Sequence, residues 1–202
     1  MKKVLLTMLT AALMGSACSQ QAGDEASGTE EELRYDAMQR NTQWEQIVAE
    51  AAEHPIQSQA CHKVYRLAQY RLGQAGKEAI LECLANSNDV LSSETAALMM
   101  SDVYIQLGMV NMAQRAAFEA LVTTKSNKAK TRALQRLTET ALVTTQYELA
   151  KKYISILEEE GNSDKWLKTV KPLVEHPELI DQHPAYQQLR QNHEKIEDQF
   201  FL

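Results

Sequence analysis

The stretch QLGMVNMAQRAAFEAL carries the pattern that most constrains what this chain can fold into. Gly108 suits a tight turn between two helices. Ala113, Ala117 and Ala120 then recur at intervals of four and three residues, which places small side chains on one helix face where a second helix can approach closely. The preceding segment, SSETAALMMSDVYIQL, supplies that second helix, with a serine of the pair 92–93 as its N-cap. We therefore predict an antiparallel helix pair.

The same pattern recurs along the chain at nearly constant intervals. Ala79 lies 34 residues before Ala113, Ala150 lies 37 residues after it, and Ile47 lies 32 residues before Ala79. No proline falls between residues 55 and 172, so several helices can form there without a strong helix breaker. One helix pair cannot bury its apolar face alone, whereas stacked neighbours can. The spacing therefore predicts about four stacked pairs.

The unit that begins at Glu94 resembles the tetratricopeptide repeat. The matching residues are Tyr104, Gly108, Val110, Ala113, Ala120 and Leu121. The large aromatic residue usual in the first helix is replaced by Ala97, and the proline usual at the end of the unit is missing. The resemblance implies an all-α, tetratricopeptide-like α-solenoid of about four antiparallel helix pairs. A C-terminal capping helix is expected to cover the last pair through Trp166, Leu167, Val170 and Leu173.

The chain opens with MKKVLLTMLTAALMGSACSQQ, which has the form of a secretory signal peptide. Its apolar run over residues 4–14 is too short to be a stable membrane span. Two interpretations remain open: ordinary cleavage after Ala17, or a bacterial lipobox in which Cys18 becomes a lipidated N-terminus. The lipobox match is imperfect, because Gly15 stands where leucine is usual. We predict the lipoprotein, with residues 1–17 as the signal peptide.

Residues 18–34 are polar and acidic and show no apolar periodicity, which is typical of a flexible linker. Asp24 and Glu25 weakly resemble the acidic signal that exports lipoproteins of the Bacteroidota type to the cell surface, but a solvated linker is the simpler interpretation. The helical-repeat domain is expected to span residues 35–202.

The composition and the missing motifs disfavour several classes of function. The net charge is −6 and no lysine and arginine stripe is present, which disfavours nucleic acid as a partner. The sequence contains no glycine-rich phosphate loop and no G-x-S-x-G motif, and no two of its histidines have the i, i+4 spacing of a zinc helix. We therefore predict no catalytic residue, no metal site and no cofactor, and we expect that the protein is not an enzyme.

Cys61 and Cys83 fall in the two helices of one predicted pair. A disulfide is possible in an exported protein, but the two residues lie at different distances from the turn and hence at different heights along the pair. Two small buried thiols are the simpler interpretation, with the disulfide as the alternative.

Tyrosines recur in the predicted repeat units. Most are expected to belong to the core, but those that line an inner groove can grip a peptide, because aromatic side chains are favoured anchors. The candidate partner-binding residues are Tyr65, Tyr70, Tyr104 and Tyr147.

Four phrases together resemble an uncharacterised family of Bacteroidales membrane proteins, in which many membrane spans precede a helical-repeat tail. They are QWEQIVAEA, YIQLGMVNMAQRAAFEA, ALQRLTETALVTTQYELAKKYISIL and KWLKTVKPL. This chain has a lipoprotein-type leader in place of the block of spans. The resemblance implies a helical-repeat architecture and an envelope location, and it implies no activity.

Together these features predict a non-enzymatic scaffold that a lipid anchors in the bacterial cell envelope, in the outer membrane, with the side of the membrane left open. The expected partner is a protein or peptide, since stacked helix pairs form an extended concave surface. The alternative is a glycan or small-molecule binding lipoprotein of a nutrient-uptake system. That alternative predicts an enclosed pocket with two or more aromatic residues and converging polar groups.

Overall fold

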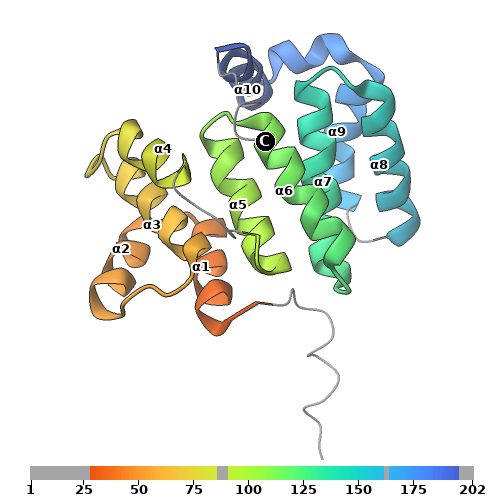
Figure 1. The fold of residues 1–202 in the computed structure, drawn as a ribbon. Helices are drawn as coiled ribbons and strands as arrows, with labels where there is room; N and C mark the ends of the chain where they lie inside the picture. Colours follow the sequence, from red (N-terminus) through yellow and green to blue (C-terminus); the bar gives the residue numbers. More distant parts are fainter. Residues whose placement is uncertain (1–27, 86–90, 162–163, 196–202) are drawn as a thin grey trace, which may run out of the picture.

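The computed structural model describes residues 28–85, 91–161 and 164–195, and within these ranges it contains helices and no strand (Figure 1). The predicted leader and the lipidation site at Cys18 lie outside the described residues. The elements are α1 (Glu30–Arg40), α2 (Trp44–Glu53), α3 (Gln59–Arg71), α4 (Lys77–Ala85), α5 (Glu94–Gln106), α6 (Val110–Thr123), α7 (Asn127–Val143), α8 (Tyr147–Glu160), α9 (Asp164–Glu175), the 3₁₀-helix η1 (Pro177–Gln182) and α10 (Pro184–Lys195). No helix in the described part combines the length and the apolar character needed to cross a bilayer.

The helices stack as successive pairs, so the all-α prediction is confirmed. α1 packs on α2, α3 on α4, α5 on α6 and α7 on α8. α3 also packs on α5 and α5 on α7, so the first helices of these three pairs lie side by side (Figure 1). α9 packs on α8, and α10 then folds back onto α7.

The α5–α6 pair matches the predicted close approach of two helices. Ala113, Ala117 and Ala120 are fully buried on α6, and the Ser101 hydroxyl of α5 donates a hydrogen bond to the Ala113 carbonyl of α6 over 2.9 Å. Such a contact requires small residues, because a larger side chain would hold the two backbones apart. Ser93 is the N-cap of α5, since its hydroxyl accepts a hydrogen bond from the Ala96 amide.

Each turn between paired helices contains one residue in the left-handed region. Gly73 and Gly108 occupy it at φ +69° and +81°, and Thr42 and Thr145 occupy it at +53° and +61°. Glycine adopts this conformation without penalty, whereas a β-branched residue such as threonine is strained there. The backbone therefore repeats one turn geometry four times, although the sequence marks it with glycine only twice.

α1 begins at Glu30, so the last residues of the segment 18–34, predicted as a linker, are helical. The predicted boundary at residue 35 missed this start because α1 has no apolar stripe. Its start is instead marked by a capping box, in which the Thr29 hydroxyl accepts from the Glu32 amide and the Glu32 carboxylate accepts from the Thr29 amide, each over 3.1 Å.

Acidic side chains of α1 also cap the two helices that begin beside it. The Glu31 carboxylate accepts hydrogen bonds from the amides of Gln57 and Ser58, both over 2.9 Å, at the start of α3. Glu32 accepts from the hydroxyls of Ser58 and Ser93, both over 2.8 Å. Negative charge is favourable at a helix N-terminus, so α1 joins the starts of α3 and α5 through polar contacts.

The C-terminal part covers the last pair as predicted. Leu167, Val170 and Leu173 of α9 are buried, and Trp166 is half-buried. Pro172 lies inside α9, which continues to Glu175. Cys61 is buried and Cys83 is half-buried, and the two form no disulfide.

Candidate functional site

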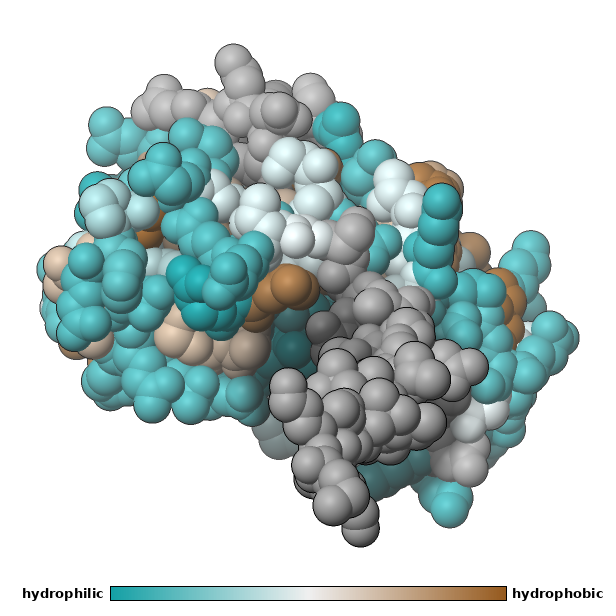
Figure 2. Space-filling view, turned by 90° about the horizontal axis from the view of Figure 1, so that it is seen from below, coloured by the Kyte–Doolittle hydropathy of each residue, from teal (hydrophilic) through white to brown (hydrophobic). Residues whose placement is uncertain are grey.

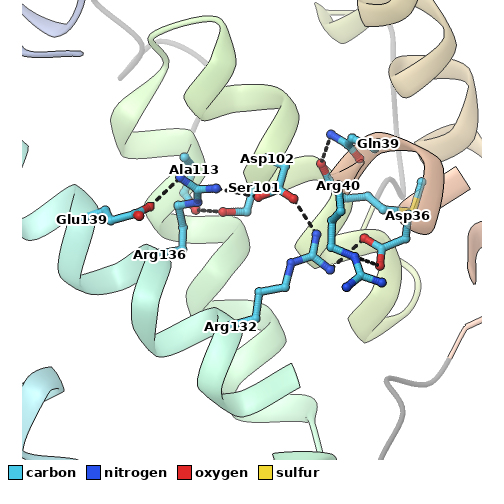
Figure 3. A network of polar contacts seen from close by, with 10 residues as sticks. Asp36, Gln39, Arg40, Ser101, Asp102, Ala113, Arg132, Arg136 and Glu139 are labelled. Carbon is cyan, nitrogen blue, oxygen red and sulfur yellow. Dashed lines mark hydrogen bonds and ion pairs between the residues drawn. The ribbon is translucent and has the colours of Figure 1, made fainter. Parts of the chain in front are cut away.

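A network of ion pairs joins α1, α5 and α7 (Figure 3). Asp102 of α5 accepts hydrogen bonds from Arg132 over 2.5 Å and from Arg136 over 2.6 Å, both on α7. Arg132 also pairs with Asp36 of α1 over 2.7 Å, and Arg136 pairs with Glu139 over 2.7 Å. The two arginines thus lie between three carboxylates that come from three different helices.

Asp102 and the two arginines of the network are held in their charged forms. Burial alone would raise the pKa of Asp102, but the guanidinium groups of Arg132 and Arg136 outweigh it and hold that pKa below its usual value. Burial likewise lowers the pKa of Arg136, and the neighbouring carboxylates of Glu139 and Asp102 raise it above its usual value. Each of these charged groups therefore has an oppositely charged partner, and the ion pairs connect α1, α5 and α7.

One face of the network borders a groove with a volume of about 630 Å³, which we call the α9/α10 groove. It lies among α3, α5, α7, α9 and α10. Its lining residues are Arg71, Ile105, Gln106, Arg136, Glu139, Trp166, Thr169, Val170, Leu173, His183, Ala185, Tyr186, Gln188, Leu189 and Asn192.

The lining of the α9/α10 groove combines apolar and polar groups. Trp166 and Leu189 are half-buried apolar residues at its wall. Arg71 at its edge donates two hydrogen bonds, over 3.0 and 3.2 Å, to the neutral side chain of Gln106. Burial raises the pKa of Tyr186, so its phenol stays neutral at physiological pH. A groove of this kind can hold an apolar side chain next to a polar or anionic group.

α10, which forms one wall of the groove, is fixed by Arg190. This guanidinium donates to the Leu142 carbonyl over 3.1 Å and to the Tyr147 hydroxyl over 2.7 Å, and it pairs with Asp181 over 2.8 Å. The sequence marked Tyr147 as a candidate partner-binding residue, and the structure places it here, as a hydrogen-bond acceptor for the residue that anchors α10.

The four candidate tyrosines are not brought together, and none of them lines the α9/α10 groove. Tyr104 is buried, with 5% of its surface exposed, because it packs into the core on α5. Tyr65 and Tyr70 are half-buried on α3, where the Tyr65 hydroxyl accepts from Gln69 over 2.8 Å. The groove residues Trp166, Tyr186 and Leu189 come from the C-terminal segments. Sequence reasoning assigned Trp166 only to the cap, because the return of α10 to α7 has no local signal.

Metal-binding and reactive groups do not gather in the described residues. No three histidine, cysteine, aspartate or glutamate side chains there are placed to hold a metal ion. Burial raises the pKa of the Cys61 thiol, which keeps it protonated. The ammonium group of Lys63 lies 3.5 Å from the sulfur of Cys83.

Comparisons with known proteins give a family and no function. The model of a family of unknown function, DUF6057, matches residues 2–202. No curated protein and no solved structure is significantly similar to the chain.

Proposed function

The chain belongs to the family of unknown function DUF6057, and we propose that it is a non-enzymatic helical-repeat scaffold, lipid-anchored through Cys18, that binds a protein or peptide partner in the bacterial cell envelope. The anchoring membrane is the outer membrane in this proposal. Four sequence phrases support a relation to Bacteroidales envelope proteins whose helical-repeat tail is tetratricopeptide-like. No nucleic acid and no cofactor takes part.

The observation that carries the proposal is the α9/α10 groove. Aromatic and aliphatic residues, Trp166 and Leu189, stand beside the charged side chains of Arg71 and Glu139. Peptide anchors of this kind lie in well-packed pockets with a polar rim. The groove is also formed on rigid elements, because the Asp102 network and Arg190 fix the helices around it.

Site-specific cross-linking in cells tests this proposal. A photoreactive amino acid in place of Gln188, at the groove, is expected to give one discrete cross-linked protein, and Leu189→Glu in the same chain is expected to abolish it. The matched control is Ile156→Glu, which adds the same charge at an exposed position on α8, outside the groove. A cross-link that persists with Leu189→Glu, or that is lost equally with Ile156→Glu, would contradict the assignment of the partner site.

The lipid anchor is tested separately. The wild-type chain is expected in the membrane fraction with Cys18 carrying acyl chains by mass spectrometry, and Cys18→Ala is expected to move it to the soluble fraction. A wild-type chain with an unmodified Cys18, or one cleaved at another position, would exclude the lipid anchor. It would not affect the proposal that the α9/α10 groove binds a partner.

A second candidate function is binding of a glycan or small molecule for nutrient uptake. It is favoured by one observation: Trp166 and Tyr186 share the α9/α10 groove with the polar groups of Arg136, Glu139 and Asn192. Aromatic faces with converging hydrogen-bonding groups are a common arrangement in small-ligand sites. Thermal-shift screening against oligosaccharides separates the two, because a specific glycan that stabilises the wild type and not Trp166→Ala would replace the peptide partner.

A further inference from the structure

We propose that the end of the solenoid formed by the C-terminal turns of α6 lies on the phospholipid surface that holds the anchor. The residues that contact the lipid are Phe118 and Val122, which we call the α6 patch. This inference rests on the proposed anchoring at Cys18 and goes beyond the proposed binding of a partner in the α9/α10 groove.

The α6 patch is the most exposed apolar surface among the large side chains in the described part of the chain. Phe118 is 53% exposed and Val122 is 59% exposed, and they lie one turn apart on α6. Leu33 and Ile156, at 36% and 38%, are the remaining exposed large hydrophobic residues in the described ranges. A scattered apolar residue needs no explanation, but two on adjacent turns form a small patch that contact with an apolar phase would cover.

The α6 patch is at the same end of the molecule as the first described residue. A Cβ atom added at Gly28 would lie 2.7 Å from that of Thr95, so Gly28 lies against the first turn of α5. α6 runs antiparallel to α5, and Ala120 of α6 packs in one cluster with Ala97 and Leu98 of α5. Figure 2 views the lower end of the molecule in Figure 1 and shows hydrophobic patches set among hydrophilic surface.

The length of chain between the anchor and Gly28 decides which end lies nearest the bilayer. Gly28 follows Cys18 by ten residues. Ten residues span at most about 35 Å. α6 alone, with 14 residues, is about 21 Å long. A tether of this length keeps the Gly28 end of the solenoid next to the headgroups, at a high local concentration.

The chemistry of this end fits an interfacial contact that the anchor assists. Phe and Val side chains insert among headgroups and acyl chains, as the apolar faces of interfacial helices do. Lys125 follows the patch in the loop before α7 and is exposed, so its ammonium group can reach lipid phosphates. Lys128 is exposed in the first turn of α7. The chain carries a net charge of −6, so general electrostatic attraction does not drive the contact.

Chemical footprinting of lysines on vesicles tests the inference. The chain from Cys18 onward, which contains all described residues, is coupled through that thiol to a maleimide headgroup in phosphatidylcholine vesicles. Cys83→Ser in every sample prevents coupling at the half-buried thiol, and Cys61 is buried. Acetylation rates of individual lysines are then compared with those of the same chain in solution. Lys151, near the opposite end of the α7–α8 pair, is the internal reference.

The expected result is a severalfold slower acetylation of Lys125 and Lys128 on vesicles, with Lys151 unchanged, and a return to the solution rates in the double variant Phe118→Ser with Val122→Ser. Ile156→Ser, at an exposed apolar residue on α8, is the matched control and should keep the protection. Equal rates for all three lysines, or protection that the double variant retains, would overturn the inference. Protection that already grows with protein concentration in solution would also overturn it, because a second copy would then cover the patch.

Because the maleimide replaces the natural anchor, this experiment does not depend on lipidation in cells. An unmodified Cys18 in the cell would refute the proposed anchor, whereas unprotected lysines on vesicles would refute only the assignment of the α6 patch as the membrane contact.

Discussion

Asp102→Asn removes one charge from the network that holds α1, α5 and α7 together and leaves its shape almost unchanged. The wild-type carboxylate pairs with Arg132 and Arg136 over 2.5 and 2.6 Å. Its side chain is 15% exposed, and the two arginine side chains are 21% and 20% exposed. The substitution therefore leaves two mostly buried guanidinium groups facing one fewer negative charge.

The expected loss of folding free energy is about 3 kcal/mol, the lower end of the range for removing one partner from a buried ion pair. Asparagine keeps one hydrogen-bond acceptor, which is why the lower end applies. With a urea m value of about 2 kcal/mol/M for a domain of this size, the midpoint of unfolding should fall by about 1.5 M.

Urea unfolding followed by circular dichroism at 222 nm measures this shift. The control is Glu148→Gln, which removes a carboxylate that pairs with Lys151 but is 83% exposed, and it should leave the midpoint within experimental error. A second variant, Asp102→Asn with Arg136→Met, should regain part of the loss, because it removes one of the two mostly buried guanidinium groups that have lost a carboxylate partner. A midpoint for Asp102→Asn equal to that of the control, or no recovery in the double variant, would refute the reasoning.

The same network makes stability depend on pH in a defined direction. The pKa of Asp102 is lower in the folded state than the ordinary value near 4 that it has when unfolded. The stabilisation is therefore fully present above about pH 4 and is lost as the pH falls through the folded-state pKa. Between neutral pH and acid, the wild type should lose more stability than Asp102→Asn, and the two curves should converge.

Further substitutions test the packing and the turns. Ala113→Leu should lower stability by more than about 2 kcal/mol by overpacking, seen as a lower urea midpoint. Gly108→Ala should lower the free energy of unfolding by about 1–2 kcal/mol, because the φ of Gly108 is +81°. Thr145→Asn should raise the free energy of unfolding slightly, because it relieves the strain of a β-branched residue in the left-handed region. Shifts of the urea midpoint that are equal in sign and size for the two variants would contradict the turn geometry. Glu32→Gln should speed amide exchange at the start of α1, measured by mass spectrometry, with the exchange of α8 unchanged.

The sequence was sufficient to predict the stacked helix pairs, because this information is local. Ala113 and Ala120 lie within one helix, and Gly108 marks its turn. The equivalent turns at Thr42 and Thr145 could not be found in this way, since threonine is rare in the left-handed region. The sequence therefore predicted the interval between units but not the residue at each turn.

The polar features were harder to predict for two different reasons. The start of α1 had a local signal, Thr29 followed three residues later by Glu32, but an analysis based on apolar periodicity overlooked it. The pair of Asp36 with Arg132 had no such signal, because the two residues meet only after three helix pairs have stacked. The α9/α10 groove depends in the same way on α10 lying against α7, which no short segment specifies.

Open stacks of helical repeats touch only their nearest neighbours, so they can melt one unit at a time, from the ends inward. Here α1 contacts α3 and α5 and reaches α7 through Asp36, and α10 returns to α7. These contacts connect both terminal parts of the domain to its central helices, so unfolding of a terminal part also destabilises α5 and α7. The domain should consequently unfold nearly all at once, with a steep transition that a linear array of the same length would lack.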